Sequence, residues 1–316
     1  MRRGLSIFLA VSFGLSALLD IALYSRYPTM GQLEAQLYTM LWGLARMYTP
    51  TLGAVISLLL TGESVWPSIM GYLNLGRRSL KYFLLSPLLI YLALGLFFLL
   101  ALPLNLADLD GLLDLMVASS GGLINRESAR TLLLISMASS YPIALTLNSL
   151  FALGEEIGWR GYLFSLLGWE FNARNVLLVG LIWGLWHSTA IALLGHNYPV
   201  LRARGIPLFV LFCTVLSATM LKLTRETGSV LPATSIHGCL NAIWGITVYS
   251  GKLKGAENEI YGGMGLLGIL SLAAIFIPLL KIGRGSDGLP SHPRGHETAD
   301  LGEMPASGEN EVRGSI

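Results

Sequence analysis

Residues 82–102 read YFLLSPLLIYLALGLFFLLAL, a run that contains no charged side chain. A helix needs about 20 mostly apolar residues to cross the hydrocarbon core of a bilayer, and this run has that length. Further apolar stretches of similar length recur along the chain. The sequence therefore predicts an all-α, polytopic transmembrane bundle of eight helices, at residues 5–23, 41–61, 82–102, 131–153, 175–195, 206–223, 230–249 and 262–280.

The composition favours a membrane protein over a soluble enzyme. Hydrophobic residues make up 53% of the 316 residues and charged residues only 13%, whereas soluble domains carry about 25% charged residues. The formal net charge is +2 without a basic patch, so we expect no nucleic-acid partner. Cys213 and Cys239 both lie in apolar stretches, which gives no sign of a disulfide framework.

Basic residues in the short connections predict the orientation of the bundle. With eight spans, one side receives Arg2, Arg3, Arg77, Arg78, Lys81, Lys222, Arg225, Lys281 and Arg284. The main exceptions on the other side are Arg202, Arg204, Lys252 and Lys254. We therefore expect both termini in the cytoplasm.

Two segments depart from a regular span. The stretch 41–61 contains Arg46 and Pro50, so we expect a helix that is kinked or tilted around the proline. Residues 283–316 are rich in Gly, Ser, Pro, Asp and Glu and poor in apolar side chains. This composition cannot bury a core and predicts a disordered cytoplasmic tail, which leaves residues 1–282 as the transmembrane helical domain.

Ionisable side chains inside membrane helices are costly, and each is therefore a functional candidate. The first group is Glu155, Glu156 and Arg160, at the end of the fourth predicted span. If the helix continues, Glu156 and Arg160 share a face and can form an ion pair, while Glu155 points about 100° away. The simpler interpretation is a charged helix end at the level of the lipid headgroups.

Two further groups lie on other predicted helices. His187 follows two tryptophans inside the fifth span, and His237 precedes Asn241 by four residues in the seventh. That spacing places His237 and Asn241 on one face, one turn apart. Taken singly, His187 fits a hydrogen-bonded core histidine, and the second pair fits an interhelical hydrogen bond. Together with the glutamates, all three groups can meet in the cytoplasmic half of the bundle, with a mouth on that side.

Small residues accompany the polar groups. Gly154 and Gly158 flank the glutamates, and Gly180 and Gly184 precede His187. Such small-xxx-small pairs let helices approach closely. Their placement supports a site built between helices.

The order and spacing of these residues resemble the CPBP intramembrane endopeptidases, the family of CAAX prenyl proteases and bacteriocin-processing proteins that is also called the abortive-infection family. The motifs that carry the resemblance are Glu155-Glu156-x-x-x-Arg160, Trp183-x-x-x-His187 and His237-x-x-x-Asn241. Trp183 stands where phenylalanine is more usual. The resemblance covers about residues 131–250, which are expected to form the catalytic core.

This resemblance implies hydrolysis of a peptide bond by an activated water. It assigns the activation of that water to Glu155 and His187, and the stabilisation of the oxyanion to His237 and Asn241. Glu156, paired with Arg160, is then a supporting residue. The chemistry is coherent, because donors fixed in a low-dielectric cavity contribute about 3–4 kcal/mol each in other oxyanion holes.

The cofactor hypothesis is zinc, which would make the protein a metalloprotease. Glu155, His187 and His237 supply three nitrogen or oxygen ligands and leave one position open, as in catalytic zinc sites. Zinc would lower the pKa of its bound water to about 7. The sequence has no His-Glu-x-x-His motif, so a metal-free mechanism stays open beside the metalloprotease.

Two other classes of function fit intramembrane Glu and His residues. One is an ion- or proton-coupled transporter, although the sequence lacks the matching broken helices of an inverted repeat. The other is a catalytically silent scaffold that binds a peptide or a lipid. The expected partners are membrane lipid and a membrane-associated or lipidated protein substrate, such as a prenylated CAAX peptide, and the sequence does not predict an oligomeric state.

Overall fold

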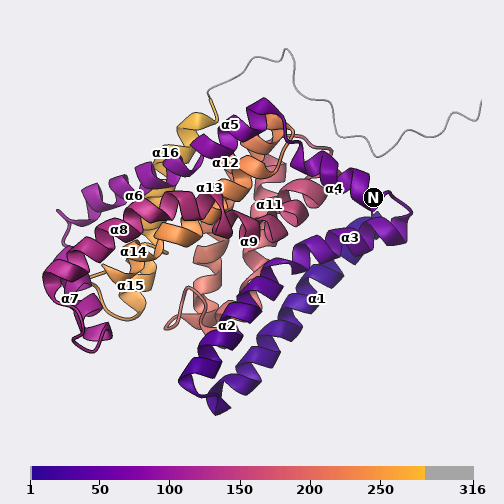
Figure 1. Cartoon of the computed structure of the whole chain (residues 1–316). Coiled ribbons are helices and arrows are strands. Elements are labelled where there is room, and N and C mark those ends of the chain that lie inside the picture. Colours follow the sequence, from indigo (N-terminus) through magenta and orange to yellow (C-terminus); the bar gives the residue numbers. More distant parts are fainter. Residues whose placement is uncertain (1, 282–316) are drawn as a thin grey trace, which may run out of the picture.

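The computed structural model describes residues 2–281, and within that range the chain is helical and has no β-strand (Figure 1). The predicted all-α class is therefore confirmed. The helices are α1 (Arg2–Arg26), η1 (Tyr27–Thr29), α2 (Gln32–Met47), α3 (Thr49–Thr61), α4 (Val65–Leu73), α5 (Arg77–Leu85), α6 (Pro87–Ala101), α7 (Leu109–Ser119), α8 (Arg126–Leu145), α9 (Leu147–Glu156), η2 (Ile157–Leu163), α10 (Phe164–Leu166), α11 (Ala173–Trp186), η3 (Ala190–Leu194), η4 (Arg202–Gly205), α12 (Ile206–Thr227), α13 (Leu231–Ile243), α14 (Gly245–Tyr249), α15 (Ala256–Tyr261) and α16 (Leu266–Leu279).

Fewer helices than predicted have the length and composition of a membrane span. Within residues 2–281 there are five, at Arg2–Thr29, Gln32–Thr61, Arg77–Ala101, Arg202–Thr227 and Ala256–Leu279. A sixth is added if Arg126–Leu145 and Leu147–Leu166, which meet at 48°, count as one bent span. The chain is thus a multi-pass helical bundle, but the predicted number of eight spans is not confirmed.

Two of the eight predicted spans have no counterpart among these six, and they are the ones that carry His187 and His237. α11 has 14 residues and α13 has 13, so each is about 20 Å long and shorter than the roughly 30 Å hydrocarbon core. Most residues of α13 are buried against other helices. The apolar run 230–249 therefore largely faces protein. The run 175–195 keeps exposed leucines at positions 177, 181 and 185, but its α-helix ends at Trp186.

Breaks in the longer helices fall near prolines. α2 ends at Met47 and α3 begins at Thr49, with Pro50 in its first turn, as the sequence predicts for this stretch. α8 contains Pro142 and ends at Leu145, before Thr146 leaves helical geometry with φ −115° and ψ −95°. Proline removes a backbone donor and clashes with the preceding turn, which accounts for a bend within a few residues.

Glycines bring the helices of the core into close contact. A Cβ atom on Gly158 would lie 2.4 Å from Cβ of Pro50, and one on Gly184 would lie 2.6 Å from Cα of Val210. η2 therefore packs directly on α3, and α11 packs directly on α12. The close approach predicted from the paired glycines is confirmed.

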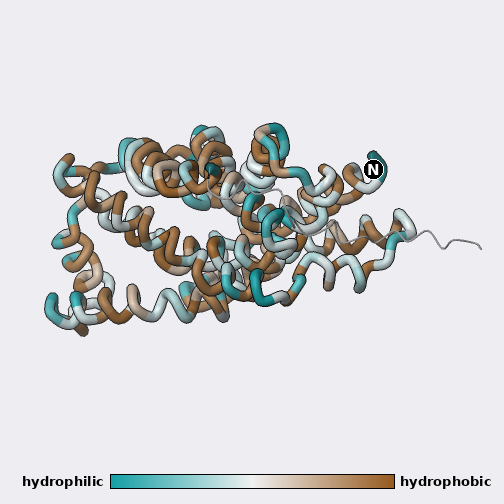
Figure 2. The backbone as a smooth tube through the Cα atoms, turned by 90° about the horizontal axis from the view of Figure 1, so that it is seen from above, coloured by the Kyte–Doolittle hydropathy of each residue, from teal (hydrophilic) through white to brown (hydrophobic). Residues whose placement is uncertain are grey.

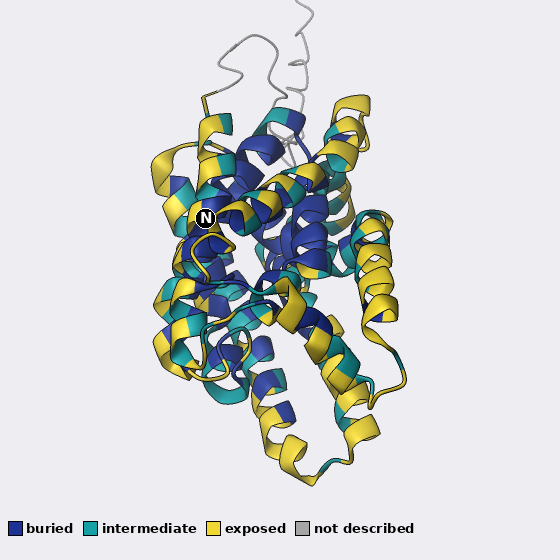
Figure 3. Cartoon of the chain, turned by 90° about the vertical axis from the view of Figure 1, so that its left-hand side faces the viewer, coloured by how far each residue is buried: buried dark blue, intermediate teal, exposed yellow. Residues whose placement is uncertain are grey.

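The surface agrees with a membrane environment. Hydrophobic residues follow the helices, and hydrophilic residues gather at turns and ends (Figure 2). Buried residues concentrate in the centre of the bundle, while the outer faces of α1 and α2 are exposed (Figure 3). Leu33 and Leu99 are each 70% exposed, and such outward-facing leucines are expected to contact lipid. The predicted tail, residues 283–316, lies outside the described residues.

Candidate active site

A cavity of about 570 Å³ lies among the helices that carry the polar motifs. Glu155 reaches it from α9, His187 from the end of α11, and His237 and Asn241 from α13. Four of the six residues singled out in the sequence therefore line one space, although they come from three separate helices. Asn241 is exposed and the other three are buried.

The carboxylate of Glu155 is fixed by a tryptophan. Nε1 of Trp183 donates a hydrogen bond of 2.7 Å to Oε2 of Glu155. Both side chains are buried, with exposed fractions of 2% for each residue. Since an indole N–H is a donor only, this contact orients the carboxylate and leaves Oε1 for another partner.

The ring of His187 is fixed by the same tryptophan. Its Nδ1 lies 2.9 Å from the carbonyl oxygen of Trp183. A carbonyl can only accept, so Nδ1 carries the proton and Nε2 of the neutral ring is an acceptor. The rings of Trp186 and Phe209 lie edge-on to His187, each with a centroid distance of 4.6 Å. Trp183 therefore connects Glu155 and His187, the two residues that the resemblance assigns to water activation.

His237 is held by the second glutamate. Its Nδ1 lies 2.8 Å from Oε1 of Glu156, and the same oxygen accepts a 3.1 Å hydrogen bond from Nη1 of Arg160. Glu156 and Arg160 are both completely buried. The Glu156–Arg160 ion pair predicted from the four-residue spacing is present.

Glu156 and Arg160 do not line the cavity and instead lie behind His237. Arg160 also donates to Oγ of Ser217 on α12 at 2.9 Å, and its guanidinium stacks 4.1 Å from the Trp183 ring. The chain forms a π-helix, η2, from Ile157, directly after the two glutamates. Local π-helical turns are common at functional sites, and this one carries Arg160.

The described residues do not gather the candidate zinc ligands into a group of three that could hold a metal ion. Among residues 2–281, no group of three His, Cys, Asp or Glu side chains is placed to hold one. Glu155 accepts from Trp183, and Nδ1 of His237 faces Glu156. The zinc hypothesis for Glu155, His187 and His237 gains no support from this geometry.

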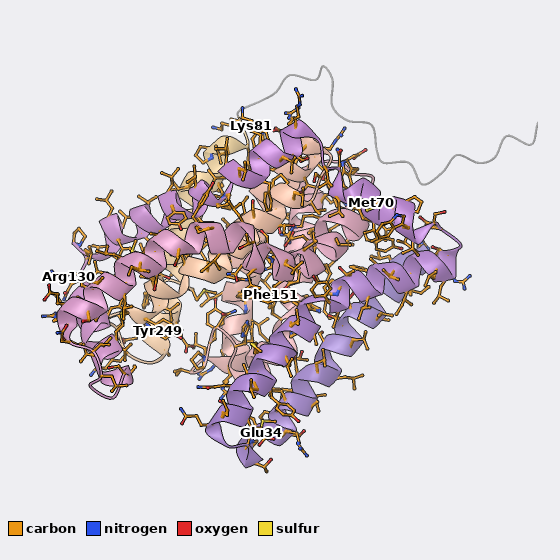
Figure 4. The ribbon with its side chains drawn as sticks, in the orientation of Figure 1. Glu34, Met70, Lys81, Arg130, Phe151 and Tyr249 are labelled. Atoms are coloured by element: carbon orange, nitrogen blue, oxygen red, sulfur yellow. The ribbon has the colours of Figure 1, made fainter. Side chains whose placement is uncertain are left out.

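Exposed residues at one edge of the cavity mark its mouth. The exposed lining residues include His196 and Pro199 after η3, and Tyr249 at the end of α14. The centroid of the His196 ring lies 5.7 Å from that of Trp42, in the second half of α2. Figure 4 shows Tyr249 far from Lys81, which lies at the predicted cytoplasmic side. The rim at Tyr249 is thus distant from the end of the bundle that carries Lys81, and the side of the membrane that the mouth faces stays a prediction.

Two charged residues near the site went unrecognised in the sequence. Asp20 and Arg46 form a buried ion pair of 2.9 Å, and Arg46 lines the cavity. The available signal was an ionisable residue within each of the first two apolar stretches. Nothing in the sequence indicates that they pair, because they lie on different helices and share no motif.

Comparison with known families agrees with the motifs. The family model described as "Type II CAAX prenyl endopeptidase Rce1-like" matches residues 137–243. This range contains all seven named residues of the three motifs. The resemblance to the CPBP family is thereby confirmed. No curated protein and no solved structure gives a significant match.

Proposed function

We propose that this chain, whose residues 137–243 match the Rce1-like family of type II CAAX prenyl endopeptidases, is an intramembrane endopeptidase. One observation carries the proposal. Glu155, His187, His237 and Asn241 line the same cavity, and that cavity lies within a bundle of apolar helices. The reaction is hydrolysis of a peptide bond by water.

Water activation is assigned to Glu155 and His187. Trp183 occupies Oε2 of Glu155, so Oε1 is free to accept a proton from water. Because Nδ1 of His187 donates to a carbonyl, Nε2 can accept the second hydrogen bond of the same water. Two acceptors would fix the direction of the water oxygen, which is the requirement for a positioned nucleophile.

Stabilisation of the oxyanion is assigned to His237 and Asn241. When both ring nitrogens of His237 carry protons, Nδ1–H is held by Glu156 and Nε2–H is left to donate. The side-chain amide of Asn241, one turn further along α13, supplies a second donor. Donors of this kind are effective because they are fixed before charge develops on the substrate.

The proposed steps balance without a further reactant. The water oxygen bonds to the carbonyl carbon, and one water proton passes to Glu155. The resulting oxyanion collapses, the C–N bond breaks, and the proton on Glu155 passes to the leaving nitrogen. The products are a carboxylic acid and an amine. No step uses a metal ion.

The proposed substrate is a membrane-associated or lipidated peptide. Much of the cavity wall is apolar, including Phe209, Phe212, Leu240 and Trp244, and such a wall would accept an apolar segment. The name of the matching family makes a prenylated CAAX-type peptide the first candidate to test. Membrane lipid is the expected surrounding partner.

The experiment is a cleavage assay with detergent-purified protein and a library of lipidated and unmodified peptides, with products identified by mass spectrometry. We expect a defined cut that is lost in Glu155→Gln. Proton flux in vesicles without cleavage would instead indicate a transporter. Peptide binding without either activity would indicate a scaffold.

A further inference from the structure

A buried ion pair joins the first two helices close to the cavity. Nε of Arg46 on α2 lies 2.9 Å from Oδ1 of Asp20 on α1, and both side chains are almost completely inaccessible. Nε1 of Trp42 donates to the same carboxylate oxygen at 2.9 Å. A buried pair of charges is tolerated only when its remaining polar atoms also find partners.

Those remaining partners lie on either side of His187. Nη2 of Arg46 donates a 2.8 Å hydrogen bond to the carbonyl oxygen of Trp186, the residue before His187. The other carboxylate oxygen of Asp20 accepts a hydrogen bond from the hydroxyl of Thr189, two residues after His187. The ion pair therefore holds the chain at both sides of this histidine.

The ring of Trp186 adds a second connection. The Arg46 guanidinium carbon lies 3.8 Å from the centre of the Trp186 ring, which in turn lies edge-on against the His187 ring. Nε1 of Trp186 donates to the carbonyl oxygen of Ser12 on α1 at 3.1 Å. The first two helices thus contact the backbone and the ring that adjoin His187.

The chain needs such support at this point. α11 ends at Trp186, and a π-helix begins at Ala190, so His187 lies where one helical hydrogen-bond pattern changes to another. Regular bonding is interrupted at a change of this kind, and backbone groups must find partners elsewhere. Arg46 supplies a donor to the carbonyl at the end of α11.

We infer that Asp20 and Arg46 are positioning residues for His187, so that the hairpin of α1 and α2 is part of the catalytic unit although it lies outside residues 137–243. The inference rests on the proposed role of His187 in water activation. A displacement of about 1 Å of a catalytic group can reduce the rate about 100-fold. Arg46 lines the cavity, whereas Thr189 does not, so Thr189 offers the cleaner test.

The test uses Thr189→Val, which keeps the side-chain shape but removes the hydroxyl, and Thr189→Ser, which keeps the hydroxyl. Ser57→Ala is the matched control, because it removes two buried hydrogen bonds of α3, to the carbonyl of Gly4 and with the hydroxyl of Tyr162, without touching the segment around His187. For the peptide identified in the library, we expect Thr189→Val to lower kcat about tenfold, with KM within about twofold. Thr189→Ser and Ser57→Ala should keep kcat near that of the unmodified protein.

A second measurement separates this inference from the proposed function. The full chain has five histidines, and their ring nitrogens can be followed by NMR after ¹⁵N-histidine labelling, with the His187 signals assigned by their loss in His187→Gln. Thr189→Val and Asp20→Asn should shift the His187 signals, and Ser57→Ala should not. Unchanged His187 signals together with unchanged kcat would overturn the inference. If no peptide is cleaved by any form, the proposed function fails, while the NMR signals still decide whether the pair positions His187.

Discussion

The indole nitrogen of Trp183 lies 2.7 Å from Oε2 of Glu155, while the carbonyl oxygen of the same residue lies 2.9 Å from Nδ1 of His187. A single residue on α11 thus connects the two side chains proposed to activate water. Its ring also stacks on the Arg160 guanidinium and lies 5.4 Å from the His237 ring. Trp183 therefore contacts Glu155, Arg160, His187 and His237.

Trp183→Phe should separate these roles, since it removes the indole N–H but leaves the backbone carbonyl and an aromatic ring. A hydrogen bond to a charged group contributes about 1.5–3 kcal/mol, so a loss of about 10- to 100-fold in kcat is expected from a misoriented Glu155. Steady-state kinetics of the purified variant would check this. Trp186→Phe is not a suitable control, because Trp186 contacts Arg46. Trp66→Phe is the control variant, because Trp66 lies on the exposed surface of α4. An unchanged kcat in Trp183→Phe would contradict the orienting role.

Glu155→Gln should abolish proteolysis while leaving the protein folded. The substitution keeps the size of the side chain but removes the group proposed to accept the proton from water. His187→Ala and His237→Ala should also abolish cleavage, by loss of the second acceptor and of an oxyanion donor. Cleavage is measured by mass spectrometry, and folding by gel filtration in detergent. Full activity in Glu155→Gln would overturn the assignment of the base.

Glu156→Gln should affect stability more strongly than Glu155→Gln does. Removing one partner of a buried ion pair leaves Arg160 charged and uncompensated, at a cost of about 3–5 kcal/mol. Asp110→Asn is the matched control, because Asp110 also pairs with an arginine, Arg126, at 2.8 Å, but the two side chains are 73% and 50% exposed. Loss of a pair near the surface costs about 1 kcal/mol or less. Thermal denaturation in one detergent would compare the stabilities of the two variants. An equal loss of stability in both would show that water reaches the Glu156–Arg160 pair.

The parts of the site that could be predicted are those fixed by local helix geometry. The spacing of Glu156 and Arg160, and that of His237 and Asn241, correctly places each pair together. Glycine spacing likewise predicts close helix contacts. The contact of Arg46 with Trp186 could not be predicted, because it joins segments 140 residues apart in the chain. The number of eight spans is not confirmed, because α11 and α13 have only 14 and 13 residues, a shortness that an apolar run in the sequence does not show.

The mouth of the cavity and the N-terminus should face opposite sides of the membrane. A Cβ on Gly4 would lie 3.6 Å from Thr61, which places the α3–α4 connection beside the N-terminus. Val200 adjoins the cavity rim at Pro199. In sealed vesicles of known orientation, an impermeant maleimide should label Ser64→Cys and Val200→Cys from opposite sides. The unmodified protein should stay unlabelled, because Cys213 and Cys239 are buried, and labelling of both variants from one side would contradict this arrangement.

Chelation should leave the activity intact. In the mechanism proposed here, Glu155 and His187 bind the water through hydrogen bonds, so that cleavage requires no bound metal ion. If Glu155, His187 and His237 instead held zinc, a strong chelator would remove activity and added Zn²⁺ would restore it, because zinc would supply the activated water. The measurement is the cleavage rate before and after dialysis against chelator, with the transition-metal content determined in the same samples. Metal-free protein that still cleaves rules out zinc, whereas loss of cleavage with recovery on Zn²⁺ would replace the water-activation step by a metal-bound one.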